Sequence, residues 1–447
     1  MNTPIFDFVR ANALKYPIRF HMPGHKGRRF LGMESWDITE IAGADELYTA
    51  SGIIGESEQN AAALFGSAKT VYSTEGSSQC IRAMVYLAAT TAKGDGRKTI
   101  LAARNAHKSF LYALALCDVD VAWMTPAVSR SLCCCPLTAA DVENAINNAK
   151  THPVAVYITS PDYLGNLLPV AEIAEVCHRS GVPLLVDNAH GAYLKFLSES
   201  LHPLDAGADL CCDSAHKTLP VLTGGAYLHI GQNASLQMRE QAKSAMALFG
   251  STSPSYLTLS SLDLCNRYLA GDLPIKLKIG VERAAKTRAV LARNGWRVLE
   301  DTEPMKLTLF STQEMSGKEL AASLREKNIE CEYADEDCLV LMPSAETKPA
   351  ELQKLIFALG EAGSPPREPF AFSLPPAEIA MTVREAIFSP AESVAAENAL
   401  GRICAAPAVS CPPAIPIAVS GERIDAERIA LMAHYGIRQV LVTASKK

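Results

Sequence analysis

Seven short apolar runs, spaced along residues 70–230 and separated by helical stretches, constrain the fold more than any other feature of this sequence. The runs are Thr70–Tyr72, Thr99–Ala102, Val121–Met124, Val154–Ile158, Leu184–Val186, Leu210–Cys212 and Ala226–Ile230. Helical periodicity lies between most of them, at Ser78–Ala92, Ser109–Leu116, Ala139–Ala149 and Ala171–Arg179. Strands that alternate with helices predict an α/β fold with a mostly parallel seven-stranded sheet covered by helices.

The remainder of the chain predicts an arm and two smaller domains. Residues 1–55 form the expected N-terminal arm, and residues 56–275 form the large sheet domain. Residues 276–365 predict a small α/β domain with strands at Trp296–Leu299, Lys306–Phe310 and Cys338–Met342. A proline-rich joint then leads to a C-terminal domain at residues 366–447.

Composition excludes several classes of protein. The formal net charge of −6 argues against a nucleic-acid partner, which requires a basic patch. No apolar stretch approaches the roughly 18 residues of a membrane span, and the N-terminus lacks a signal peptide's apolar core. The 13 cysteines contain no C-x-x-C pair, so neither a zinc site nor any other metal site is expected. These features predict a protein of a reducing, cytoplasmic compartment.

Polar residues follow several of the predicted strands directly. They are Thr74–Ser78, His107, Asp187 and Ser214–Lys217. Because ligands of open α/β sheets bind beyond the carboxyl ends of the strands, we expect these residues to converge on one site.

Lys217 and Asp187 are the two contacts that pyridoxal phosphate (PLP) requires. A lysine can form the Schiff base with the cofactor, and a carboxylate at a strand end can bind its pyridine nitrogen. Lys108 competes for the first role, because it too follows an Ala-His pair. Lys217 is the better candidate, since it comes one strand–helix–strand step after Asp187 and precedes the Gly224-Gly225 turn.

Other residues at the strand ends suit the rest of the cofactor. Gly76, Ser77 and Ser78 open a helix, where backbone N–H groups and hydroxyls can bind a phosphate, although serine is also an ordinary N-cap. The ring of His107 could stack on the pyridine face. Ala189 leaves room for a flat ring, and His190 could reach the phenolic oxygen.

Taken together, the sequence resembles the bacterial ornithine/lysine/arginine decarboxylases of PLP fold type I, in their short form without an N-terminal receiver-like domain. The matching stretches include FHMPGHKG (20–27), AALFGSAKTVYSTEGSSQCI (62–81), RNAHKS (104–109), SPDYLGNL (160–167), LLVDNAHGA (184–192), the DSAHKTLPVLTGGAYLH region and STSPSYLTLSSLD (251–263). VREAIFSPAESV (383–394) resembles the family's C-terminal domain. The fold implied is that of aspartate aminotransferase.

The resemblance implies a role for each site residue. Lys217 would hold PLP, His107 would stack on it and Asp187 would bind its pyridine nitrogen. Ser77, Ser78, Ser214 and His216 would surround the phosphate, with Thr252 or Ser253 reaching the phosphate of a neighbouring subunit in a homodimer. Lys217 or His216 would protonate the α-carbon after loss of CO₂, and Glu422 would lie near the distal cationic group of the substrate. The substrate would be arginine, lysine or ornithine, and the product a polyamine precursor.

The C-terminal segment departs from the family pattern. The family usually has a tyrosine before Pro-Pro, then a glycine and Pro-Gly-Glu, whereas this chain has Cys411, Ala414 and Ser420 at those positions. The choice of substrate therefore stays open, and so does the role of the His21–Lys26 loop, which could be solvated or could lie over a cleft.

Two other functions stay open at this point. A PLP-dependent aminotransferase or acyl-transferring synthase of the same fold would need an arginine to bind the substrate carboxylate, and Arg367, Arg384 and Arg402 are the late candidates. A PLP-binding protein without catalysis is the third hypothesis, which the presence of Lys217, His107 and Asp187 disfavours.

Overall fold

The structure is a computed structural model that describes residues 1–94, 96–409 and 413–444. The chain forms two compact units, the first built from Met1–Asp95, Val154–Tyr157 and Val170–Pro274 and the second from Gly96–Pro153, Ile158–Pro169 and Ile275–Lys447. These units interleave along the chain, so they divide it differently from the predicted domain boundaries at residues 55, 275 and 365, which stay predictions.

A seven-stranded sheet with the order β1-β7-β6-β5-β4-β2-β3 confirms the predicted α/β fold. Its strands are β1 (Lys69–Ser73), β2 (Thr99–Ala103), β3 (Asp120–Met124), β4 (Ala155–Thr159), β5 (Leu184–Asp187), β6 (Leu210–Asp213) and β7 (Ala226–Ile230). The pairs β5–β6 and β2–β3 are parallel, whereas β7 is antiparallel to both β1 and β6. The connection from β6 to β7 holds only the single helical turn α7 (Ala215–Thr218), and the two strands pair as antiparallel neighbours.

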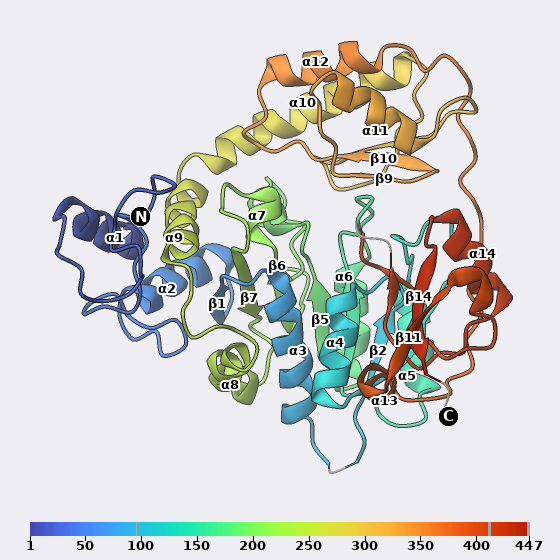
Figure 1. The fold of residues 1–447 in the computed structure, drawn as a ribbon, viewed down its shortest axis with the longest axis horizontal. Helices are drawn as coiled ribbons and strands as arrows, with labels where there is room; N and C mark the ends of the chain where they lie inside the picture. Colours follow the sequence, from blue (N-terminus) through green and yellow to red (C-terminus); the bar gives the residue numbers. More distant parts are fainter. Residues whose placement is uncertain (95, 410–412, 445–447) are drawn as a thin grey trace. The chain divides into compact units, whose positions relative to one another are not determined.

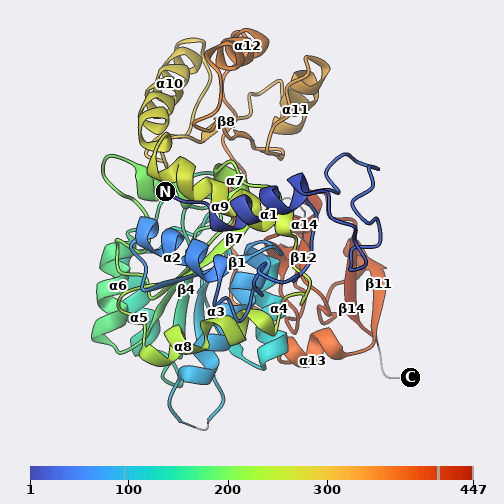
Figure 2. The same ribbon diagram turned by 90° about the vertical axis from the view of Figure 1, so that its left-hand side faces the viewer.

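Helices of the first unit pack on its strands and on each other. α1 (Pro4–Leu14), α2 (Ile53–Phe65) and α9 (Tyr256–Ala270) contact one another (Figure 2). α1 buries Ile5, Val9 and Ala13, which are spaced four residues apart and therefore share one helix face. α3 (Ser77–Thr91) contacts β6, β7 and α8 (Leu236–Ala247), and α6 (Val170–Arg179) contacts β5.

The second unit contains a small α/β layer. Antiparallel strands β8 (Leu307–Phe310), β10 (Cys338–Leu341) and β9 (Tyr333–Ala334) form its sheet in that order. α10 (Leu273–Arg293), α11 (Gly317–Glu326) and α12 (Pro349–Leu359) cover one face of it (Figure 1). The predicted strand at Trp296–Leu299 does not form, because Val298 makes only an isolated bridge to Leu309.

The same unit holds α4 (Lys108–Cys117), α5 (Ala139–Asn147) and the C-terminal elements. These are α13 (Val383–Phe388), β11 (Ala391–Ala395), β12 (Ala408–Val409), β13 (Pro416–Ala418), α14 (Ala426–His434) and β14 (Gln439–Thr443). β11 pairs with β14, and α13 packs on α4. Within the described ranges, no helix is both long and apolar enough to cross a membrane.

Candidate active site

Three strands of the first unit bring most of the predicted site residues to one edge. Since β7 is antiparallel to both of its neighbours and β5 is parallel to β6, strands β1, β6 and β5 run in the same direction. Their carboxyl ends are therefore followed, at the same edge of the sheet, by Gly76–Ser78, Ser214–Lys217 and Asp187–His190.

Lys217 lies on α7 (Ala215–Thr218), the single turn of helix that follows β6. Lys217 is an exposed residue, and its Nζ is 3.0 Å from Nε2 of the buried His190. An ammonium group has only donors, so the imidazole nitrogen accepts this hydrogen bond. His190, which follows the neighbouring strand β5, thus supplies a base in contact with the predicted cofactor lysine.

His216 is held by the turn that leads into β7. Its backbone N–H donates to the carbonyl oxygen of Gly225 over 3.1 Å, and its ring Nδ1 is 3.0 Å from the same oxygen. A carbonyl oxygen can only accept, so Nδ1 carries a proton and the orientation of the ring is fixed.

Asp187 is 2% exposed at the end of β5. Its Oδ2 accepts a hydrogen bond from the Tyr157 hydroxyl at 3.1 Å, and its Oδ1 accepts from the Ala189 backbone N–H at 3.2 Å. Burial raises the pKa of this carboxyl group, and the positive charge of Lys217 lowers it in part. A second cation beside Asp187 would favour its ionised form further.

The turn between β1 and α3 has the features of an anion site. Gly76 has a φ of +71°, and a Cβ added there would meet no atom within 4 Å, so the space above the turn is open. The Ser214 hydroxyl donates to the Ser77 hydroxyl at 2.8 Å, which joins the ends of β1 and β6. Ser77 is also the first residue of a 15-residue helix, whose N-terminal N–H groups favour a phosphate.

The backbone of Gly224 packs against the turn between β1 and α3, and only glycine fits at this position. Gly224 has a φ of +95°, and a Cβ there would lie 2.6 Å from the Thr74 carbonyl oxygen. The Gly224 carbonyl oxygen accepts a hydrogen bond from the Gly76 N–H at 2.7 Å.

These features fit PLP. The open turn at α3 can take its phosphate, the buried carboxylate of Asp187 can take its pyridine nitrogen, and Lys217 can take its aldehyde. The small side chain of Ala189 directly follows this acidic strand end.

His107 and Lys108 lie in the second unit, at the start of α4. The ring Nδ1 of His107 accepts a hydrogen bond from the Ser109 N–H at 3.1 Å and lies 3.0 Å from the Ser109 hydroxyl. Lys108 is the first residue of the helix, and its backbone N–H donates to the Ala414 carbonyl. Stacking of His107 on the cofactor stays a prediction, as does a contact from Thr252, which lies in the exposed loop before α9.

Glu422 is buried among arginines of the second unit. Its Oε2 accepts from Arg428 Nε at 3.2 Å and from the Val419 N–H at 2.9 Å, and it lies 3.8 Å from a guanidinium nitrogen of Arg104. Arg104 also donates to the carbonyl oxygens of Pro416 and Ile417, so it joins the end of β2 to β13.

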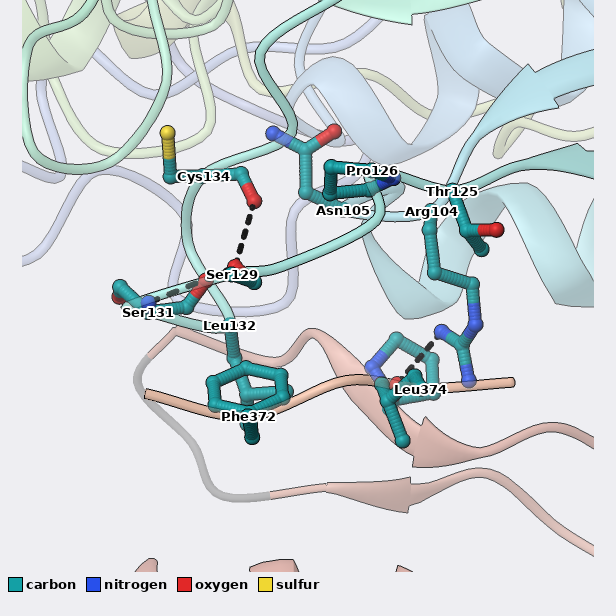
Figure 3. Close-up of a pocket in the computed structure, with 11 residues that line it drawn as sticks. Arg104, Asn105, Thr125, Pro126, Ser129, Ser131, Leu132, Cys134, Phe372 and Leu374 are labelled. Carbon is teal, nitrogen blue, oxygen red and sulfur yellow. Dashed lines mark hydrogen bonds between the residues drawn. The ribbon is translucent and has the colours of Figure 1, made fainter. Parts of the chain in front are cut away.

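The second unit also contains a small cavity and a larger one. The cavity beside Arg104 and Asn105 measures about 20 Å³, which is room for roughly one water molecule (Figure 3). A larger cavity of about 580 Å³ follows the edge strand β3, and Glu422 and Ser420 are among the residues that line it. Cys411 and Ala414 also depart from the family pattern. Cys411 lies outside the described residues.

Sequence reasoning missed two buried partners of the site. Tyr157 lies inside β4, and its hydroxyl contacts Asp187. A tyrosine in a buried strand needs a hydrogen-bond partner for its hydroxyl, and this was the signal in the sequence. Asn188 directly follows Asp187, and its Nδ2 donates to Asp213 at 2.7 Å. No spacing rule links positions 188 and 213, so only the structure could reveal this contact.

Comparisons with known proteins identify the family of this chain. A family model described as "Orn/Lys/Arg decarboxylase, major domain" matches residues 3–308. An uncharacterized protein of Bacillus subtilis (strain 168), YaaO, is 30% identical over 459 residues, covering 96% of this chain and 93% of that protein. An arginine decarboxylase of Halalkalibacterium halodurans is 30% identical over 462 residues, covering 96% of this chain and 92% of that enzyme.

Solved structures share the fold. The lysine decarboxylase LdcF of Francisella novicida has a TM-score of 0.80 at 16% identity, covering 99% of this chain and 81% of its own. The constitutive lysine decarboxylase of E. coli has a TM-score of 0.79 at 19% identity, covering 99% and 82%. A serine palmitoyltransferase of Sphingomonas wittichii has a TM-score of 0.58 at 16% identity, covering 79% and 83%.

Proposed function

Because the chain belongs to the Orn/Lys/Arg decarboxylase family, and is thus a PLP-dependent decarboxylase of basic amino acids, we propose that arginine is its substrate and that Lys217 holds the cofactor. Arginine is preferred over lysine and ornithine because relatives that cover more than nine-tenths of this chain are arginine decarboxylases. The observation that supports the site assignment is the 3.0 Å contact between Lys217 and His190. His190 comes shortly after Asp187, at the end of β5.

Each residue of the proposed site has a chemical task. When bound, PLP supplies an electron sink for the charge left at the α-carbon. Asp187 would hold a proton on the pyridine nitrogen, and the N-terminus of α3 with Ser77, Ser78 and Ser214 would bind the phosphate. His107 would orient the ring by stacking.

Proton transfer would fall to groups beside the α-carbon. Lys217 and His216 are the candidates to return a proton there once CO₂ has left, which gives agmatine from arginine. His190 is in contact with Lys217 and would take a proton from the Lys217 amine or return one to it. The amine product would feed polyamine synthesis.

The active form proposed is a cytoplasmic homodimer. The twelve cysteines of the described part are free thiols, which suits a reducing compartment. The apolar arm, which we define as the exposed side chains Leu14, Tyr16, Ile18, Phe20, Met22, Phe30, Leu31 and Met33, is a surface that water disfavours. A second copy of the chain is the proposed cover.

The test is a decarboxylation assay on the purified protein with PLP. Arginine, lysine and ornithine are supplied separately, and CO₂ and the amine product are measured. We expect CO₂ and agmatine from arginine, with much slower turnover of the other two. Turnover of lysine or ornithine in preference would overturn the substrate assignment, and transfer of the amino group without CO₂ would overturn the reaction.

Two matched lysine variants test the site. Lys217→Ala should abolish both turnover and the visible absorbance of the PLP–lysine linkage, whereas Lys108→Ala should keep that absorbance. The reverse pattern would move the cofactor to Lys108.

A further inference from the structure

A buried hydrogen-bonded cluster lies around the carboxyl end of β6 in the first unit. It consists of Asp213, Asn188, His202, His229 and Thr70, and we call it the Asp213 cluster. The side chains of Asp213, Asn188, His202 and His229 are fully buried, and none of the tasks proposed above uses them. Such a concentration of buried polar groups is costly unless the groups satisfy one another.

Asp213 is the centre of this cluster. Its Oδ2 accepts from Nε2 of His202 at 3.0 Å and from Nε2 of His229 at 3.2 Å. Its Oδ1 accepts from Nδ2 of Asn188 at 2.7 Å. Burial alone would raise the pKa of Asp213, yet the hydrogen bonds that it accepts from His202 and His229 hold it below its usual value. Asp213 is therefore a fixed buried carboxylate at neutral pH.

Bonds on the far side of the histidines fix their rings. His229 Nδ1 is 2.8 Å from the Thr70 hydroxyl, and His202 Nδ1 accepts from the Leu204 N–H at 3.3 Å. Both imidazoles are therefore constrained to present Nε2 to Asp213.

The position of the Asn188–Asp213 bond gives it a consequence for catalysis. Asn188 directly follows Asp187, and Asp213 directly precedes Ser214, which begins the segment that carries Lys217. The Asn188 N–H also donates to the Cys212 carbonyl at 3.0 Å. Two bonds thus join the strand end that bears the proposed pyridine partner to the strand end that bears the proposed cofactor lysine.

Asn188 is retained at an energetic cost. Its Oδ1 is buried without a hydrogen-bond partner in the part of the chain that the structure describes, and a buried acceptor left unpaired destabilises the folded state. Only a glycine fits beside it, since a Cβ at Gly191 would lie 1.9 Å from this oxygen. The hydrogen bond that the Asn188 side-chain amide makes is the one that its Nδ2 donates to Asp213.

We propose that Asp213 is a positioning residue, which holds Asn188 and thereby fixes the Asp187 carboxylate relative to the Lys217 amine. The histidines hold Asp213 in place, so that the distance between the two cofactor contacts is set from inside the first unit. This inference rests on the proposed cofactor roles of Lys217 and Asp187.

An exchange of the two side chains tests it. Asn188→Asp places a carboxylate against that of Asp213 and breaks the bond by repulsion. Adding Asp213→Asn to that variant restores a donor–acceptor pair in reverse, because the new amide can donate to the carboxylate introduced at position 188 and still accept from the histidines. The PLP dissociation constant and the pH titration of the visible PLP–lysine band are measured at each step, with the melting temperature of the PLP-free protein as a check on folding.

We expect Asn188→Asp to weaken PLP binding at least tenfold and to shift the titration of the visible band, and the double variant to recover affinity to within about threefold. Asn266→Ala removes buried hydrogen bonds to the Ser57 carbonyl and the Tyr72 hydroxyl, outside the cluster and the proposed cofactor contacts, so it should lower the melting temperature and leave PLP affinity unchanged. Asn188→Ala provides a second break of the bond should the charged variant fail to fold.

Two outcomes would overturn the inference. One is unchanged PLP affinity and titration in both Asn188 variants, and the other is a double variant as weak as Asn188→Asp alone. Either result, with the visible band still lost in Lys217→Ala, would leave the proposed function standing. Persistence of the band in Lys217→Ala would instead overturn the proposed function itself.

Discussion

At the scale of single residues, Glu422 shows how burial changes the meaning of a motif residue. The resemblance predicts that it recognises the cationic end of the substrate, but its Oε2 already contacts Arg428 and lies near Arg104. Two guanidinium groups beside one carboxylate leave little negative potential for a third cation. The geometry therefore favours a role in joining β2, β13 and α14.

Glu422→Gln separates these two roles. We expect a fall in melting temperature, because removing one partner from a buried ion pair costs about 3–5 kcal/mol, and only a small change in KM for arginine. Thermal unfolding and steady-state kinetics provide the measurements. A KM raised more than tenfold at an unchanged melting temperature would instead support the substrate contact.

Asp263 gives a pH dependence of stability that is independent of catalysis. It is buried, it accepts hydrogen bonds from the Phe6 N–H and the Ser57 hydroxyl, and burial raises its pKa to about 6. The folded state therefore keeps a proton that the unfolded state releases near pH 4. Stability from this group is fully present below about pH 4 and is lost as the pH rises to about 6, by at most about 3 kcal/mol.

Asp263→Asn should remove this pH dependence. Denaturant unfolding of both proteins across pH 4–7 measures it, and the difference in unfolding free energy between them should change by up to about 3 kcal/mol over that range. Parallel curves for the two proteins would show that Asp263 does not titrate there.

At the scale of elements, apolar runs were a reliable guide to the strands. All seven predicted strands form within a residue or two of their predicted bounds, and most of these runs are buried in the sheet, although β3 at its edge is only partly buried. The strand expected at Trp296–Leu299 failed because apolar character alone does not distinguish a strand from a buried loop. Helix α2 was missed, although it ends at a left-handed glycine, Gly66.

The candidate site was predictable only in part for a related reason. Strand ends can be read from the sequence, so Asp187, Ser214 and Lys217 could be placed at one edge of the sheet. Contacts such as Asn188–Asp213 and Arg104–Glu422 depend on side chains far apart in the chain, and no periodicity reports them.

The turn that joins β1 to α3 supplies a prediction at this scale. Gly224→Ala should weaken PLP binding and lower stability by about 1–3 kcal/mol, since it adds both φ strain and a contact of 2.6 Å with the Thr74 carbonyl. Gly181→Ala is the matched control, because Gly181 also has a positive φ but a Cβ there meets no atom within 4 Å. PLP titration and thermal unfolding measure both variants. Equal effects of the two changes would mean that the backbone conformation matters and the close approach does not.

At the scale of the whole molecule, the apolar arm is the main unexplained surface of the first unit. Ile18 is 86% exposed and Phe20 is 95% exposed, and from Leu14 to Met22 every second residue is a large apolar one. Leu14 ends α1, and the alternating Ile18, Phe20 and Met22 lie in the non-helical stretch that follows, where an exposed apolar cluster suits burial against a partner surface.

Ile18→Ser combined with Phe20→Ser should therefore dissociate the proposed dimer. Sedimentation velocity measures the assembly, with Phe357→Ser as the control, because Phe357 is 89% exposed on α12 while the large apolar residues next to it in the sequence are not exposed. A monomeric wild type, or a double variant that still sediments as a dimer, would show that the arm is not the dimer contact.

The position of β7 between β1 and β6 has a consequence for how the protein is made. β1 is an edge strand whose sole neighbour in the described sheet is β7, which lies far downstream in the chain. At roughly 5–20 residues per second, the ribosome needs on the order of ten seconds after β1 emerges before that neighbour exists. During this interval Val71 and Tyr72 of the nascent chain have no native partner strand, so we expect the first unit to be most prone to aggregation before Ile230 has left the exit tunnel.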